Sequence, residues 1–187
     1  MASDTWSIVE RTFDPGRLHH GETVYTVGNG YLGTRGAFEE PFAGEMRATF
    51  LHGVFDDAPV VFTELANAPD WLELEVLLDG ERFDLSTGEL IAYTRTLELR
   101  TGRLRREVEW RSPKGRLTRL IFERFASLAD PHLCAVQLLV TPIDYSGRIE
   151  VHSGLNGEAD NLSLKHWRWL EQGLRGQEAW LRTQTRA

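Results

Sequence analysis

The chain has 187 residues, a formal net charge of −7, 41% hydrophobic residues and a single cysteine. This length fits one domain, and the apolar fraction is sufficient for a hydrophobic core, which argues against disorder. An acidic chain is poorly suited to nucleic acid or an anionic membrane, because neither polyanion attracts it. No apolar run approaches the roughly 20 residues that span a bilayer, and the N-terminal residues lack the features of a signal peptide. We therefore expect a cytoplasmic protein.

Alternating apolar and polar residues predict β-strands along much of the chain. Residues 71–85 form the first predicted hairpin, and its turn is Asp79-Gly80, a dipeptide that accepts the positive φ angles of a type I′ turn. Residues 103–125 predict a second hairpin that turns at Ser112-Pro113-Lys114-Gly115. We expect its return strand to be buried on both faces, because apolar residues occupy both sets of alternate positions.

The pattern continues to the end of the chain. Residues 133–151 predict a third hairpin, in which a loop at 141–147 joins two apolar strands. Helical signals are weak: residues 162–174 could hold a helical turn or two before glycines interrupt them. Residues 179–186 resemble the start of another strand, an unusual place for a domain to stop, so we expect a fragment. The pattern as a whole indicates an all-β sandwich or barrel.

The motifs for cofactors and metals are weak. Gly28-Asn29-Gly30-Tyr31-Leu32-Gly33 matches the dinucleotide fingerprint, but no helical pattern follows it, so we interpret it as a glycine-rich turn. The six histidines show no zinc-ligand spacing and are interpreted as structural or surface residues. Cys134 lies in an apolar stripe, which predicts a buried, inert thiol. We predict no cofactor-binding or metal-binding residue.

Two pairs of carboxylates and a group of tryptophans remain. Glu39-Glu40 and Asp56-Asp57 are adjacent, so each pair diverges on a strand, whereas glycoside hydrolysis needs two carboxyls about 5 to 9.5 Å apart around one sugar. We interpret both pairs as solvated turn acids. The chain has six tryptophans, with a local concentration at Trp167-Arg168-Trp169. Their indole rings could pack in the core or between domains, or stack on a sugar.

Residues 22–40 resemble the N-terminal signature of glycoside hydrolase family 65, which contains maltose, trehalose, kojibiose and nigerose phosphorylases and acid trehalases. Asn29 to Gly36 is the most specific part of the match. Residues 51–56, 65–72 and 153–157 are similar to further family segments, so the resemblance covers nearly the whole chain.

The resemblance implies a galactose-mutarotase-like supersandwich, an antiparallel all-β fold. It implies that residues 1–187 are this N-terminal domain, incomplete at its C-terminal end, and that the catalytic (α/α)₆ barrel lies outside the chain. The fragment is then inactive, and no catalytic residue can be assigned. The implied partners are the protein's own barrel, an α-glucoside disaccharide, inorganic phosphate as co-substrate in a phosphorylase, and a second subunit in a homodimer.

The polar residues of the signature are the candidates for contact with substrate or with the barrel: Asn29, Tyr31, Arg35 and Glu39. Arg35 could pair with a carboxylate such as Glu39 or Glu40, or face the barrel. We favour a structural role for this glycine-rich region, with a role at the interface or near substrate as the alternative. Two other functions remain open. One is a stand-alone carbohydrate-binding β-sandwich. The other is a mutarotase-like epimerase, for which the sequence offers no convergent acid and base.

Overall fold

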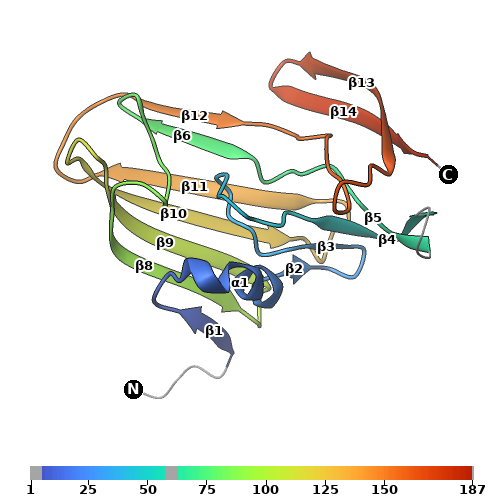
Figure 1. The fold of residues 1–187 in the computed structure, drawn as a ribbon, viewed down its shortest axis with the longest axis horizontal. Coiled ribbons are helices and arrows are strands. Elements are labelled where there is room, and N and C mark those ends of the chain that lie inside the picture. The colour runs from blue at the N-terminus through green and yellow to red at the C-terminus, as the bar shows by residue number, and fades with distance from the viewer. Residues whose placement is uncertain (1–5, 58–62, 187) are drawn as a thin grey trace.

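A five-stranded antiparallel sheet forms one layer of the computed structural model, which describes residues 6–57 and 63–186 (Figure 1). Its central strands alternate strictly, so one face carries most of the buried side chains. In spatial order the strands are β1 (Ser7–Glu10), β8 (Glu89–Glu98), β9 (Arg103–Arg111), β10 (Leu117–Ala126) and β11 (Cys134–Pro142).

A smaller sheet covers the inner face of the first. It contains β12 (Ile149–Ser153), β6 (Leu74–Leu78) and β7 (Glu81–Arg82), in that order. Between the layers Phe83 packs edge-on against Trp110 with ring centroids 5.4 Å apart, which is a favoured aromatic arrangement. The buried core cluster comprises Val76, Leu78, Phe83, Tyr93, Val108, Trp110, Leu120 and Phe122. The all-β sandwich expected from the sequence is confirmed.

Two further groups of strands complete the fold. A four-stranded sheet contains β2 (Val27–Gly28), β3 (Leu32–Thr34), β4 (Thr49–Asp57) and β5 (Thr63–Asn67). Strands β13 (Trp167–Arg175) and β14 (Glu178–Thr185) form a separate hairpin, which Figure 1 shows at one end of the molecule. The strand expected at 179–186 is confirmed as β14.

The only helical segments within the described residues follow β1. The 3₁₀ turn η1 (Pro15–Arg17) begins where the Asp14 carboxylate accepts a hydrogen bond from the Gly16 amide at 2.9 Å. It leads into α1 (Leu18–Val24), a helix that the sequence did not predict. No helix in the described part of the chain is long and apolar enough to cross a membrane.

Three predictions about the strands were wrong. The third hairpin does not form, because β12 pairs with β6 in the opposite layer, with Ile149 opposite Leu78. Residues 162–174 contain no helical turn; most of them belong to β13. The return strand β10 is fully buried on one face only, and Phe125 on the other face is 40% exposed. The predicted turn at Asp79-Gly80 is supported, since φ is 52° and 78° at these residues.

Candidate functional site

The glycine-rich segment forms the hairpin between β2 and β3, as its interpretation as a turn required. Asn29 organises this turn: its Oδ1 accepts hydrogen bonds from the amides of Tyr31 and Leu32, both at 3.0 Å. Its Nδ2 donates to the carbonyls of Ser127 at 2.7 Å and Pro131 at 3.0 Å. The Asn29 side chain therefore uses both its oxygen and its nitrogen in hydrogen bonds that shape the turn and join it to the loop that follows β10.

Tyr31 stands at the surface end of the same turn. It is half-buried, and its ring meets the exposed His132 ring edge-on, with centroids 4.5 Å apart. This contact leaves part of the tyrosine facing outward, which is compatible with the predicted contact surface and does not test it.

Arg35 points toward helix α1. Its Nε donates to the Met46 carbonyl at 3.1 Å, and its Nη2 lies 3.2 Å from the Glu22 carboxylate. The expected pairing with Glu39 or Glu40 is therefore wrong, because both of those carboxylates lie against a different set of arginines. Glu22, fully buried, also accepts from the Met46 amide at 2.8 Å and contacts His19 at 3.0 Å. The sequence around Glu22 did not indicate that this residue is buried and paired with Arg35.

Glu39 and Glu40 lie inside the molecule, so their interpretation as solvated turn acids is wrong. Arg106 of β9 donates to Glu40 at 2.6 Å and to Glu39 at 2.9 Å, and Arg124 of β10 donates to Glu39 at 2.9 Å. All four side chains are at most 4% exposed. Two neighbouring carboxylates thus converge on one guanidinium, which an extended strand would not allow.

A third buried arginine extends this cluster. Arg95 of β8 is the cross-strand neighbour of Arg106, its guanidinium stacks 4.4 Å from the Tyr25 ring, and it donates to the Gly36 carbonyl. We call Glu39, Glu40, Arg95, Arg106 and Arg124 the buried charge cluster. A signal for it existed in the sequence, since position 106 alternates with Leu104 and Val108 on the inner face of β9.

The electrostatics of the cluster follow from its burial. Burial alone would raise the pKa of Glu39, but Arg124 and Arg106 outweigh it and hold that pKa below its ordinary value. Burial lowers the pKa of Arg124 to about 10, with Arg95 and Arg106 acting in the same direction and Glu39 opposing it. Glu39 is thus ionised near neutral pH, and its carboxylate is paired with guanidinium groups. Such groups are suited to fixing a segment, and unsuited to exchanging protons with a substrate.

Arg35 also lines a hollow of about 410 Å³. Among the residues that line it are Glu45, Glu64 and Asn67, and neither Glu39 nor Glu40 reaches it. One oxygen of Glu45 is buried there without a hydrogen-bond partner, and burial raises the pKa of this carboxyl. The hollow therefore brings Arg35 beside two carboxylates and an amide, but it does not unite the four predicted residues.

The histidines and the cysteine differ in their burial and in their contacts. No group of three metal-ligating side chains occurs among the residues that the structure describes. His166, however, is buried between Asp56 at 2.9 Å and Glu64 at 2.8 Å, a contact that sequence reasoning missed. Asp56 is accordingly buried and not a solvated turn acid, whereas Asp57 is exposed. Cys134 is half-buried, and burial raises the pKa of its thiol.

The tryptophans of the hairpin are used partly in packing. The Trp167 indole donates to the Asn67 carbonyl at 2.7 Å. Trp169 covers Gly157, where an added Cβ would lie 2.4 Å from the indole ring. Trp169 and Trp180 nevertheless remain 41% and 42% exposed. The exposure of these two rings is therefore compatible with both interpretations, packing and stacking on a sugar.

Comparison with known proteins places this geometry in a family. Residues 8–187 match the model of the N-terminal domain of glycosyl hydrolase family 65. The chain is 42% identical over 162 residues to the kojibiose phosphorylase of Halothermothrix orenii, covering 87% of this chain and 21% of that protein. It is 30% identical over 175 residues to the α,α-trehalose phosphorylase of Thermoanaerobacter brockii, covering 86% of this chain and 23% of that protein.

A solved structure shows the same fold. The structure described as "Putative kojibiose phosphorylase from human microbiome" superposes with a TM-score of 0.88 at 21% identity, covering 97% of this chain and 26% of that one. The chain thus spans only about a fifth to a quarter of the length of the relatives it matches. With a family model matched over nearly every residue, the chain belongs to glycosyl hydrolase family 65, of which it carries the N-terminal domain.

Proposed function

We propose that this domain is the non-catalytic scaffold of a cytoplasmic family 65 enzyme that cleaves an α-glucosidic disaccharide. The observation that carries the proposal is the similarity to kojibiose and trehalose phosphorylases, each four to five times as long as the matched segment. These names favour phosphorolysis over hydrolysis. Inorganic phosphate is then the co-substrate, and the catalytic acid lies in a barrel outside residues 1–187. The enzyme needs no bound cofactor.

The ion pairs of the buried carboxylates support a structural, non-catalytic role for this domain. Glu39 and Glu40 neutralise buried arginines, Glu22 binds Arg35, and Asp56 binds His166. A general acid must reach the glycosidic oxygen and exchange its proton, and these groups are committed to ion pairs. Asn29, Tyr31, Arg35 and Glu39 therefore act by shaping and holding the glycine-rich segment, which we propose packs toward the barrel.

Two assays test the proposal. The purified chain, mixed with kojibiose or trehalose and phosphate, should release no glucose 1-phosphate, with an intact phosphorylase as positive control. A chimera in which this domain replaces the matching segment of the Halothermothrix orenii enzyme should regain activity that is lost when that segment is deleted. Turnover by the isolated chain would overturn the assignment as a non-catalytic domain. An inactive chimera whose two parts are both folded would overturn the scaffold role.

Carbohydrate binding by the domain itself is a second candidate, favoured by the exposed indoles of Trp169 and Trp180. Isothermal titration with glucose, maltose, trehalose and kojibiose tests it. Saturable binding that Trp180→Ala abolishes would establish a sugar-binding surface on the hairpin. The absence of heat with all four sugars would rule this candidate out at the concentrations used and leave the scaffold. The same sample in sedimentation analysis tests whether the chain forms a homodimer.

A further inference from the structure

The β13–β14 hairpin has few attachments to the rest of the molecule. Among the described residues its two strands pair only with each other, and most of their side chains are exposed, with Leu174 at 82%. Figure 1 shows it as a separate element at one end of the fold. A two-stranded hairpin is marginally stable in water, so its position depends on the contacts at its base.

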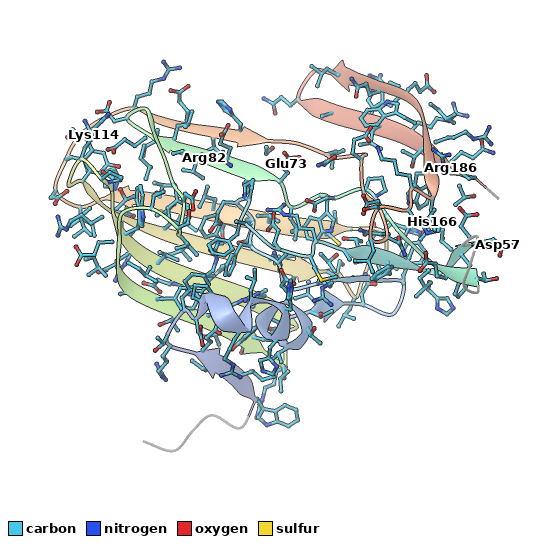
Figure 2. All side chains as sticks on the ribbon, in the orientation of Figure 1. Asp57, Glu73, Arg82, Lys114, His166 and Arg186 are labelled. Atoms are coloured by element: carbon cyan, nitrogen blue, oxygen red, sulfur yellow. The ribbon has the colours of Figure 1, made fainter. Side chains whose placement is uncertain are left out.

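One of those contacts is ionic and buried. His166 directly precedes β13, is 1% exposed, and lies where the hairpin meets β4 and β5 (Figure 2). Its Nδ1 is 2.9 Å from Oδ2 of Asp56 on β4, and its Nε2 is 2.8 Å from Oε1 of Glu64 on β5. The histidine thus binds two strands of the neighbouring sheet at once.

This geometry favours the charged form of the histidine. A neutral imidazole has one N–H, so it can donate to only one of the two carboxylates and turns a lone pair toward the other. An imidazolium donates to both. Within residues 6–57 and 63–186, the charged groups in contact with the ring are Asp56 and Glu64, both acidic, and the neighbouring cation Lys165 is paired with Glu158.

The two carboxylates also determine the pH range. Burial would lower the pKa of His166, but the hydrogen bonds and charges of Asp56 and Glu64 outweigh burial and raise that pKa above the ordinary histidine value. A group with a raised pKa in the folded state stabilises that state at low pH, and the stabilisation is lost as pH rises through the raised pKa.

We propose that His166, as an imidazolium held between Asp56 and Glu64, is a proton-operated latch that fastens the β13–β14 hairpin to strands β4 and β5. Deprotonation releases the base of the hairpin while the two-layer sandwich stays folded, because the core cluster contains no residue of the hairpin. The latch is independent of the proposed function, since it acts within this domain alone.

Trp167 supplies a local reporter of the latch. Its indole N–H donates to the Asn67 carbonyl of β5, one residue along from His166. In ¹H–¹⁵N spectra recorded across a pH series, the indole resonance should report a docked hairpin below the raised pKa of His166 and a released one above it. Corrected hydrogen-exchange protection of the β13 and β14 amides should fall over the same pH range. Protection in β9 and β10 should stay constant across this range.

Variants separate a latch from a passive contact. Glu64→Gln should move the alkaline midpoint to lower pH, because one of the two charges that raise the His166 pKa is removed. His166→Gln should abolish the alkaline transition and leave protection of the hairpin low at all pH values. His152→Gln is the matched control: His152 lies 3.2 Å from Glu75 but is 59% exposed. It should leave the profile of the hairpin unchanged.

Three results would overturn the latch. The first is hairpin protection that does not vary with pH in the wild-type chain. The second is an alkaline midpoint that Glu64→Gln leaves in place. The third is an alkaline transition that persists in His166→Gln. If His166→Gln fails to fold, the midpoint shift in Glu64→Gln still decides the question.

Discussion

Replacing Arg106 with methionine tests the reasoning about the buried charge cluster. Arg106 contacts both Glu39 and Glu40, whereas Arg124 contacts only Glu39 of these two carboxylates. The variant therefore leaves Glu40 without its guanidinium partner in a site that is almost inaccessible to water. Removing one member of a buried ion pair typically costs about 3–5 kcal/mol, because the remaining charge is desolvated without compensation. Arg106→Met should lower the free energy of unfolding by that amount near neutral pH.

The control is an arginine on the solvent side of the neighbouring strand. Arg119 lies 3.1 Å from Glu107 and 3.2 Å from Glu109, so it makes as many ion pairs as Arg106, but it is 48% exposed. Exposed pairs contribute about 0–1 kcal/mol, and Arg119→Met should cost no more than that. The comparison therefore varies burial while it keeps the chemistry of the substitution constant.

Urea denaturation followed by far-ultraviolet circular dichroism gives both free energies. The slope against urea should be unchanged in the two variants, so that the midpoints alone report stability. If Arg106→Met does not fold, Arg106→Lys keeps a charge and should cost less than loss of the whole pair. Equal costs for Arg106→Met and Arg119→Met would refute the conclusion that burial makes this cluster structural.

Three further perturbations test the glycine-rich segment and the charges beneath it. Gly36→Ala should lower the free energy of unfolding by about 1–3 kcal/mol, because the new Cβ would lie 2.8 Å from Tyr25 main-chain and side-chain carbons; an unchanged melting temperature would contradict this. Asn29→Ala should cost about 1–3 kcal/mol and speed hydrogen exchange in residues 28–33, since four hydrogen bonds are lost; unaltered exchange would argue against the turn's dependence on this side chain. Wild-type stability should fall in acid: Glu39 has a lowered pKa, so its contribution is present above the ordinary carboxyl pKa and is lost as pH drops through the lowered one. Urea midpoints from about pH 7 to about pH 3 measure this, and Glu39→Gln should flatten the profile.

The local parts of the fold could be predicted because they depend on neighbouring residues. Asp79-Gly80 makes its turn through the φ angles of two residues, and strands β9 and β10 follow a strict alternation. The partner of β12 could not be predicted in this way. Its apolar residues suit either layer, and adjacency in sequence favoured β11 over β6. Pairing across the sandwich is decided by which apolar faces close the common core, a property of the whole chain.

The candidate site could not be recognised from the sequence for a related reason. Arg106 occupies an inward position of β9, but an arginine there is interpretable only once its carboxylate partners are known, and those lie 66 and 67 residues away. His166 likewise meets Asp56 across 110 residues of sequence. Charged side chains are rarely buried unless they are paired, so burial and pairing had to be recognised together.

The position of the arginines explains why a fold would retain such a costly cluster. The segment from Arg35 to Glu40 is largely irregular backbone, yet it runs through the interior, where every carbonyl needs a hydrogen-bond donor. Arg124 donates to the Arg35 carbonyl at 3.1 Å, and Arg95 donates to the carbonyl of Gly36. Arg47 donates to the Glu39 carbonyl, also at 3.1 Å. These guanidinium groups provide the donors that a neighbouring strand would otherwise supply, and the carboxylates of Glu39 and Glu40 neutralise the positive charge that this brings into the interior. The same group of side chains thus provides hydrogen bonds to the backbone and neutralises the buried charge. Arg106→Met removes only the charge neutralisation. The loss in free energy of unfolding should therefore depend on pH, while the turn at Asn29 stays intact.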